Sequence, residues 1–113
     1  MTQADRYDLL HDYLHNKKLD GSYQAAMYIL SSSEDMTEEV LPYLSMHGID
    51  FELYIKEVEY TGSDAVMVGL AYNLFKWKSE SPPSPHDLAN VGFPHIEIAL
   101  EAIFRQRPAP GGN

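Results

Sequence analysis

Residues 61–77 form the stretch that most restricts how this chain can fold. They read T-G-S-D-A-V-M-V-G-L-A-Y-N-L-F-K-W, and between Ala65 and Phe75 only Asn73 is neither apolar, aromatic nor glycine. A helix that is apolar around most of its circumference must be covered on nearly all sides by other elements. The run is shorter than the roughly 20 apolar residues that a membrane span needs. We therefore predict that residues 63–77 form the central buried helix of a small domain.

Helical patterns precede this stretch. A helix is expected to begin after Thr2, with Thr2 as its N-cap and Asp5 as its third residue. Residues 20–22 break the pattern and offer a cap for a second, largely buried helix, Y-Q-A-A-M-Y-I-L. Residues 37–48 predict a short or kinked helix, because Pro42 lacks the amide hydrogen that a helix interior requires.

A proline-rich segment and a last helix follow the apolar stretch. Residues 79–85, S-E-S-P-P-S-P, have the composition of a linker, and H-D-L-A-N after it predicts one helical turn. A final amphipathic helix beginning at Pro94 is expected to pack on the core through residues that recur at helical spacing: Ile96, Ala99, Leu100, Ile103 and Phe104. Residues 1–107 are thus expected to form one helical domain, followed by a flexible tail at 108–113.

Residues 49–58, I-D-F-E-L-Y-I-K-E-V, fit two patterns. Phe51, Leu53 and Ile55 alternate as in a strand, whereas Phe51, Ile55 and Val58 share one helical face. Because no second segment has comparable strand character, helix or extended loop is favoured over sheet. The expected fold class is all-α: a compact bundle of about five helices around the central helix at 63–77, with a short extended segment near 49–58 as an alternative.

Composition narrows the range of functions that this chain can have. The 113 residues include no cysteine, which excludes disulfides and thiolate zinc sites, and the amino terminus lacks the pattern of a secretory signal. A cytoplasmic location without a cofactor is expected. The net charge is −9. Residues 34–64 contain nine acidic residues and a single basic residue, Lys56. Direct nucleic-acid binding is disfavoured because it needs a basic surface.

The acidic segment and one aromatic residue are the predicted contact points for a basic protein partner. An acidic surface attracts basic partners, including proteins whose usual ligand is nucleic acid. The residues expected to bind such a partner are Glu34, Asp35, Glu38, Glu39, Glu52, Glu57, Glu59 and Trp77.

The first helix carries the residues of an enzymatic alternative. Asp8, His11, Asp12 and His15 fall on one helical face, a spacing that suits a divalent transition metal, but that face points to solvent and no metal is assigned. Arg6 and His11 make an R-x-x-x-x-H spacing that resembles the motif of all-helical ribonucleases whose site is completed across a dimer. Here the motif comes first in the chain, and the two side chains stand apart on the helix.

Gly69 and Asn73 are exceptions within the apolar stretch. Gly69 costs about 1 kcal/mol relative to alanine in a helix interior, so it predicts the close approach of a neighbouring helix. Asn73 is expected to fix a loop by a hydrogen bond, either that of residues 61–63 or the segment near Asp50.

Several segments together resemble a known group of proteins. They are Y-x-x-A-M-Y-I-L, I-D-F, the T-G-S turn running into G-L-A-Y-N-L-F, and A-L-E-A-I-F-R. Over residues 19–107 the chain resembles small uncharacterised bacterial and phage-associated proteins that share a domain of unknown function. The resemblance implies a conventional small domain encoded on a mobile element, and it supplies no activity, cofactor or catalytic residue.

Three functional hypotheses follow. The first is an acidic interaction domain that inhibits or regulates a basic, nucleic-acid-handling protein. The alternative is a hydrolytic enzyme, either metal-dependent at His11 and His15 or a dimeric ribonuclease using Arg6 and His11. The third is a homodimer that buries exposed aromatic surface such as Trp77.

Overall fold

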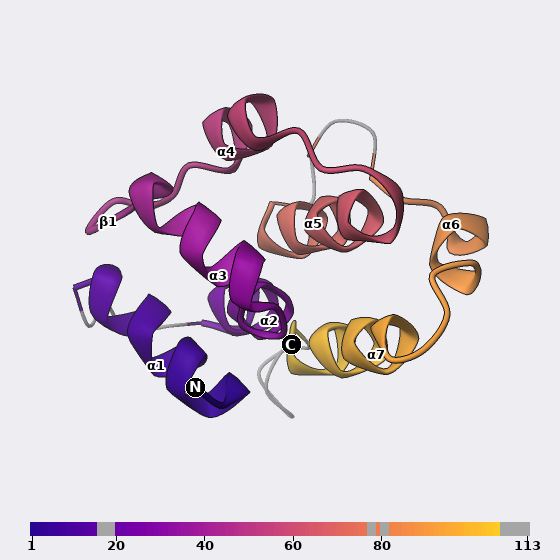
Figure 1. Ribbon diagram of the computed structural model, residues 1–113, viewed down its shortest axis with the longest axis horizontal. Coiled ribbons are helices and arrows are strands. Elements are labelled where there is room, and N and C mark those ends of the chain that lie inside the picture. The colour runs from indigo at the N-terminus through magenta and orange to yellow at the C-terminus, as the bar shows by residue number, and fades with distance from the viewer. Residues whose placement is uncertain (16–19, 77–78, 80–81, 107–113) are drawn as a thin grey trace.

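Helices make up nearly all of the regular structure in the computed structural model, which describes residues 1–15, 20–76, 79 and 82–106 (Figure 1). The α-helices in this part are α1 (Gln3–Tyr13), α2 (Gly21–Ser31), α3 (Glu34–Val40), α4 (Phe51–Val58), α5 (Gly62–Phe75), α6 (Pro85–Ala89) and α7 (His95–Gln106). A 3-10 turn (Leu41–Tyr43) leads into two short antiparallel strands, β1 (Leu44–Ser45) and β2 (Gly48–Ile49). The predicted all-α bundle is confirmed.

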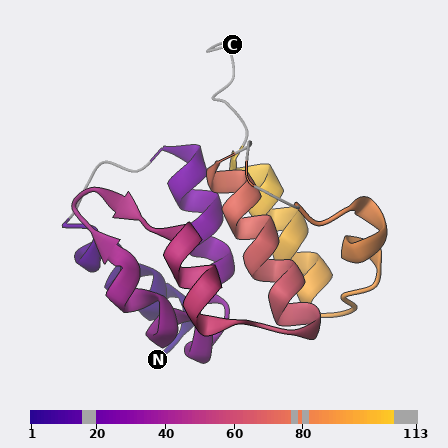
Figure 2. The ribbon, with the colours of Figure 1, turned by 90° about the horizontal axis from the view of Figure 1, so that it is seen from above.

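The helix at the centre of the bundle is α2. It contacts α1, α3, α5 and α7, and seven of its eleven residues are buried. Figure 2 shows α2, α5 and α7 side by side, and these three helices contact one another pairwise. An element surrounded on four sides provides most of the core of a domain this small.

The apolar stretch of α5 does not occupy the predicted central position. Only Met67, Val68, Leu70 and Ala71 are buried among its fourteen residues. Its inner side packs on α2 and α7, while its opposite side lines a groove described below. Apolar composition therefore identified a packed helix but not the centre of the fold. No helix in the described ranges is both long and apolar enough to cross a membrane.

Short side chains begin most of the helices. Thr2 and Asp5 form the predicted capping box of α1, and Ser84 starts α6 in the same way. Ser33 accepts a hydrogen bond from the amide of Met36 at 3.2 Å, so α3 begins at Glu34, earlier than expected. Because the serine run both ends α2 and caps α3, the turn between these helices is short.

The segment that fitted two patterns is helical. Asp50 caps α4 by accepting a bond from the amide of Leu53 at 3.2 Å, and the helix runs from Phe51 to Val58. Extended structure precedes it at Gly48 and Ile49. Within residues 49–58 the preference for helix over sheet is confirmed from Phe51 onward, whereas Ile49 belongs to β2 and pairs with Leu44. The turn at Pro42 is the 3-10 turn between α3 and β1.

The last helix packs on the core in an unexpected orientation. Ala99 and Ala102 are buried, whereas Leu100 and Phe104 are 61% and 62% exposed. Of the residues expected to pack on the core, Ala99 is buried and Ile96 is partly buried, so the expectation is wrong only for Leu100, Ile103 and Phe104. α7 approaches α2 closely: a Cβ atom on Gly21 would lie 3.0 Å from the carbonyl oxygen of Gln106. Such close packing accommodates small side chains and turns the larger ones away.

Candidate binding surface

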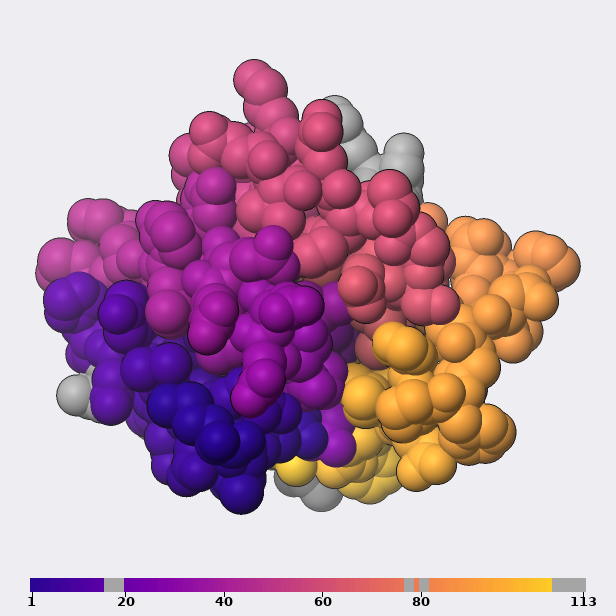
Figure 3. Space-filling view, in the orientation of Figure 1, coloured from indigo at the N-terminus to yellow at the C-terminus, as the bar shows by residue number. Residues whose placement is uncertain are grey.

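The predicted carboxylates of α3 and α4 lie on the surface. We call them the acidic face, and all of them are exposed: Glu34, Asp35, Glu38, Glu39, Glu52, Glu57 and Glu59. The 3-10 turn and the two strands bring α4 back next to α3, and both helices are visible on the side of the molecule shown in Figure 3. Trp77, the aromatic residue predicted to join this set, lies outside the described residues.

Tyrosine hydroxyl groups hold several of these carboxylates in place. The pairs are Tyr43 to Glu57 at 2.8 Å, Tyr60 to Glu39 at 3.0 Å and Tyr72 to Glu52 at 3.3 Å. Each hydroxyl donates to a carboxylate oxygen, which keeps the negative charge and fixes its position. The partners are far apart in sequence, so spacing along the chain gave no signal for them. They give the acidic face an ordered set of acceptors.

One of these tyrosines is connected to the core. The hydroxyl oxygens of Tyr54 and Tyr60 are 2.7 Å apart, and Tyr60 donates its only hydroxyl hydrogen to Glu39. Tyr54, which is fully buried, must therefore be the donor to Tyr60. Burial is the main cause that raises the pKa of both phenols above the usual value near 10. The network keeps two neutral phenols beneath a charged surface.

Alkaline pH is expected to destabilise the fold through this pair. Because the folded-state pKa values of Tyr54 and Tyr60 are raised, their stabilising contribution is complete below about pH 10. It is lost as the pH rises further, since the unfolded chain releases these protons first. Urea unfolding at increasing pH measures how steeply the free energy of unfolding falls above about pH 10. The fall is expected to be shallower for Tyr54→Phe than for the wild type.

Tyr13→Phe is the matched control, because Tyr13 is exposed. Its unfolding should follow the wild-type pH dependence. An identical slope for Tyr54→Phe and the wild type would contradict the role assigned to the buried pair.

A groove lies between α4 and α5, next to the acidic face. Its volume is 240 Å³, and it is lined by Ile55, Glu59, Tyr60, Ala65, Val68, Gly69 and Tyr72. Ile55, Ala65 and Val68 supply apolar surface, while a carboxylate and two phenols supply polar groups. Lysine and arginine side chains combine an apolar stem with a charged head, and both are attracted to aromatic faces. The lining of this groove suits such a side chain.

Gly69 lies in the wall of this groove. A Cβ atom there would meet Pro83 Cδ at 3.5 Å, an ordinary contact, so in the described part of the chain no neighbouring helix requires the glycine. The predicted close approach of a helix at Gly69 is wrong. A glycine in a helix interior still costs about 1 kcal/mol relative to alanine. What the missing side chain provides at this position is space in the groove.

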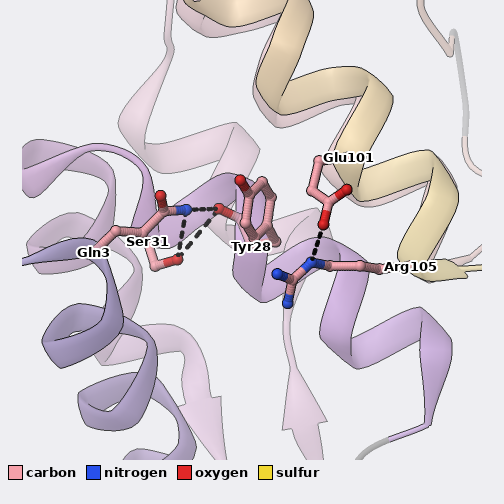
Figure 4. A network of polar contacts seen from close by, with 5 residues as sticks. All are labelled: Gln3, Tyr28, Ser31, Glu101 and Arg105. Carbon is pink, nitrogen blue, oxygen red and sulfur yellow. Dashed lines mark hydrogen bonds and ion pairs between the residues drawn. The ribbon is translucent and has the colours of Figure 1, made fainter.

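A second hollow, of 320 Å³, lies between α1, α2 and α7, and its lining includes Gln3, Tyr28 and Arg105. Figure 4 shows these three residues with their polar partners Ser31 and Glu101. The Gln3 amide donates to the carbonyl oxygen of Tyr28 at 3.0 Å and to the hydroxyl of Ser31 at 3.4 Å. Arg105 lies 4.3 Å from the centre of the Tyr28 ring and donates to Glu101 at 3.2 Å. These groups bind one another across the three helices, so we assign them a structural role.

The described structure does not bring His11 and His15 together as a metal site. Arg6 donates to the carbonyl oxygens of Ser31 at 2.6 Å and Met1 at 2.9 Å, which ties α1 to the end of α2. α1 ends at Tyr13, and His15 adopts a positive φ of 57°. His11 and His15 therefore do not share a helical face as the spacing suggested. No group of three or more His, Cys, Asp or Glu side chains within the described ranges could hold a metal ion.

Asn73 fixes a loop, as expected, but not one of those named from the sequence. Its side-chain amide donates to the hydroxyl of Ser79 at 3.3 Å. Ser79 is buried and follows the end of α5. Asn73 therefore helps to set the direction of the chain as it leaves α5. Because this bond joins residues only six apart in the chain, the sequence could have suggested Ser79 as the partner of Asn73.

Comparisons of the chain with protein-family models, with curated proteins and with solved structures find no match.

Proposed function

We propose that this protein is a binding module that recognises a basic segment of a partner protein. The acidic face attracts the segment, and the groove between α4 and α5 receives one of its lysine or arginine side chains. The observation that carries this proposal is the groove itself, in which Glu59, Tyr60 and Tyr72 border apolar surface beside tyrosine-held carboxylates.

The two parts of the surface have different energetic roles. Exposed ion pairs contribute only about 0–1 kcal/mol each, so the carboxylates mainly speed association and favour basic partners. Binding energy concentrates where a side chain is desolvated in a well-fitting pocket. The groove offers such a place because its apolar wall can cover the stem while Glu59 neutralises the charge.

A partner that handles nucleic acid fits this chemistry. Such proteins carry basic surfaces that neutralise phosphates, and an acidic protein can occupy the same surface. The module would then act as an inhibitor or regulator in the cytoplasm.

Binding of labelled peptides tests the proposal. A panel of short peptides rich in arginine or lysine, with scrambled-charge versions, is titrated against the protein and followed by fluorescence anisotropy. The variant Glu38→Gln/Glu57→Gln/Glu59→Gln is expected to bind the best peptide about tenfold more weakly, a loss of about 1.4 kcal/mol. The matched control Asp8→Asn/Asp12→Asn/Glu97→Gln removes the same charge from other exposed positions and should change binding less than about twofold.

A second pair of variants tests the groove. Gly69→Leu fills it without changing charge and is expected to weaken binding, whereas Ala89→Leu adds the same type of side chain at an exposed position of α6 and should not. Thermal unfolding of both variants checks that they fold. Equal losses for both charge variants, or unchanged binding by folded Gly69→Leu, would rule out recognition at this surface.

A further inference from the structure

The polar side chains in the groove between α4 and α5 are arranged to accept hydrogen bonds. Tyr60 donates its hydroxyl hydrogen to Glu39 at 3.0 Å, and Tyr72 donates its hydrogen to Glu52 at 3.3 Å. A phenol has a single hydrogen, so both are already used. Glu59, the carboxylate in the lining, only accepts. These side chains therefore suit a ligand that donates hydrogen bonds and accepts none.

Glu59 differs from the other carboxylates of the acidic face in its bonding. Glu39, Glu52 and Glu57 each accept a hydrogen bond from a tyrosine, and Lys76 lies 3.7 Å from Glu52. Within the described part of the chain, no ion pair includes Glu59. Its side chain is exposed and lines the groove. Both carboxylate oxygens are thus open to a cation from another molecule.

The backbone at Glu59 is unfavourable for a residue with a side chain. Glu59 ends α4 with φ 55° and ψ 63°, the left-handed conformation that glycine most often takes at the end of a helix. A Cβ atom in this conformation costs stability, and such positions gather at sites of binding. The chain therefore carries a carboxylate where glycine would fold more favourably.

Tyr72 adds an aromatic surface that is fixed in position. Its hydroxyl is bonded to Glu52, and one face of its ring is covered by Phe51, with 13° between the ring planes and 5.2 Å between the centroids. The ring can therefore meet a ligand only through its other face or its edge. Because Tyr72 also lines the groove, this surface lies near the open carboxylate of Glu59.

A planar cation suits this combination better than a spherical one. A guanidinium group is weakly hydrated, stacks on aromatic rings and binds both oxygens of one carboxylate through parallel N–H groups. An ammonium group is strongly hydrated and points its three N–H groups in different directions, so one carboxylate satisfies only part of them. The groove therefore offers more to arginine than to lysine.

We propose that the groove selects an arginine side chain over a lysine side chain. The guanidinium binds Glu59 and lies against Tyr72, and the methylene stem follows Ala65 and Gly69, where α5 has small side chains. This inference rests on the proposed recognition of a basic segment and adds that one position of that segment is an arginine. The other basic residues of the segment meet the acidic face through charge alone, where lysine and arginine are equivalent.

Three labelled peptides of equal charge test the selection by fluorescence anisotropy. The first alternates lysine and serine, the second has arginine in place of one central lysine, and in the third both methyl groups of a dimethylated arginine lie on one terminal nitrogen. Methylation keeps the charge but blocks the paired hydrogen bonds to a carboxylate. The second peptide is expected to bind about tenfold more tightly than the other two.

Two variants place the selection on Glu59. Glu59→Gly is expected to reduce the preference for the arginine peptide to less than about twofold, because the open carboxylate is gone. It is also expected to raise the melting temperature by about 4 °C, since glycine adopts the left-handed conformation freely. Lost selectivity in a more stable protein cannot come from a damaged fold. The matched control Glu38→Gln removes the same charge from α3, away from the groove, and should keep the preference unchanged.

The results separate this inference from the proposed function. Equal binding of all three peptides, weakened by the charge variants, would overturn the selection of arginine but leave recognition of a basic segment in place. Absence of binding by every peptide would overturn both. An arginine preference that persists unchanged in Glu59→Gly would overturn the placement of the guanidinium on Glu59.

Discussion

Replacing Phe51 with alanine is expected to lower the free energy of unfolding by about 3–5 kcal/mol. Phe51 is 2% exposed and is the first residue of α4. Its ring stacks on Tyr72 with centroids 5.2 Å apart and lies 5.3 Å from the ring of Phe75. These contacts attach α4 to α5, so alanine both removes a large apolar side chain and leaves a cavity between the helices.

Urea unfolding of Phe51→Ala at a fixed low protein concentration measures this loss. Phe93→Ala is the matched control, since the same atoms are removed from a side chain that is 77% exposed, and it should change the free energy of unfolding by less than about 0.5 kcal/mol. Phe51→Leu keeps most of the volume and is expected to cost about 1 kcal/mol. Similar losses of unfolding free energy for Phe51→Ala and Phe93→Ala would show that Phe51 does not attach α4 to α5.

Replacing Gly48 with alanine is expected to lower the free energy of unfolding by about 3 kcal/mol. Gly48 has a φ of 116°, a conformation that residues with a Cβ atom rarely adopt. A Cβ atom would also lie 2.5 Å from the hydroxyl oxygen of Tyr23, and Gly48 is buried. Strain in the backbone and overlap with the tyrosine therefore act together at the start of β2.

Thermal and urea unfolding of Gly48→Ala are compared with those of Gly69→Ala, which makes the same change where the structure has room. Gly69→Ala is expected to raise the free energy of unfolding by about 0.5–1 kcal/mol, because alanine favours a helix interior. The double variant Gly48→Ala/Tyr23→Phe separates the two causes at Gly48, since it removes the overlapping hydroxyl but not the strain. A higher free energy of unfolding for Gly48→Ala would contradict the strain and overlap assigned there, and a lower one for Gly69→Ala would contradict the free space at Gly69.

The sequence predicted the parts of the fold that depend on neighbouring residues. The capping box of Thr2 and Asp5 joins atoms only three residues apart, so it was visible before the structure. Helical periodicity likewise predicted α2, α5 and α7 and the all-α class. Residues 51–58 were harder, because their apolar pattern fits a strand as well, and the lack of a partner strand decided for helix.

The candidate site was predictable only in part. The exposure of the carboxylates of α3 and α4 could be predicted from composition, since a dense run of acidic residues cannot be buried. The tyrosines that bond to these carboxylates could not be predicted, because Tyr60 and Glu39 are 21 residues apart and meet only through packing. The groove was missed for the same reason, although Gly69 drew attention to its place on α5.

The sequence by itself determined where α1 begins, which residues are apolar and where the acidic charge gathers. These features depend on hydrogen bonds within a few residues and on side-chain chemistry. The tertiary structure alone decided that α2 is central, that Leu100 and Phe104 of α7 face outward, and that α4 and α5 enclose a groove. Periodicity shows that a helix has an apolar side, but which side meets the core depends on the shape of the neighbouring helices. The close packing of α7 on α2 buries Ala99 and Ala102 and leaves Leu100 and Phe104 exposed.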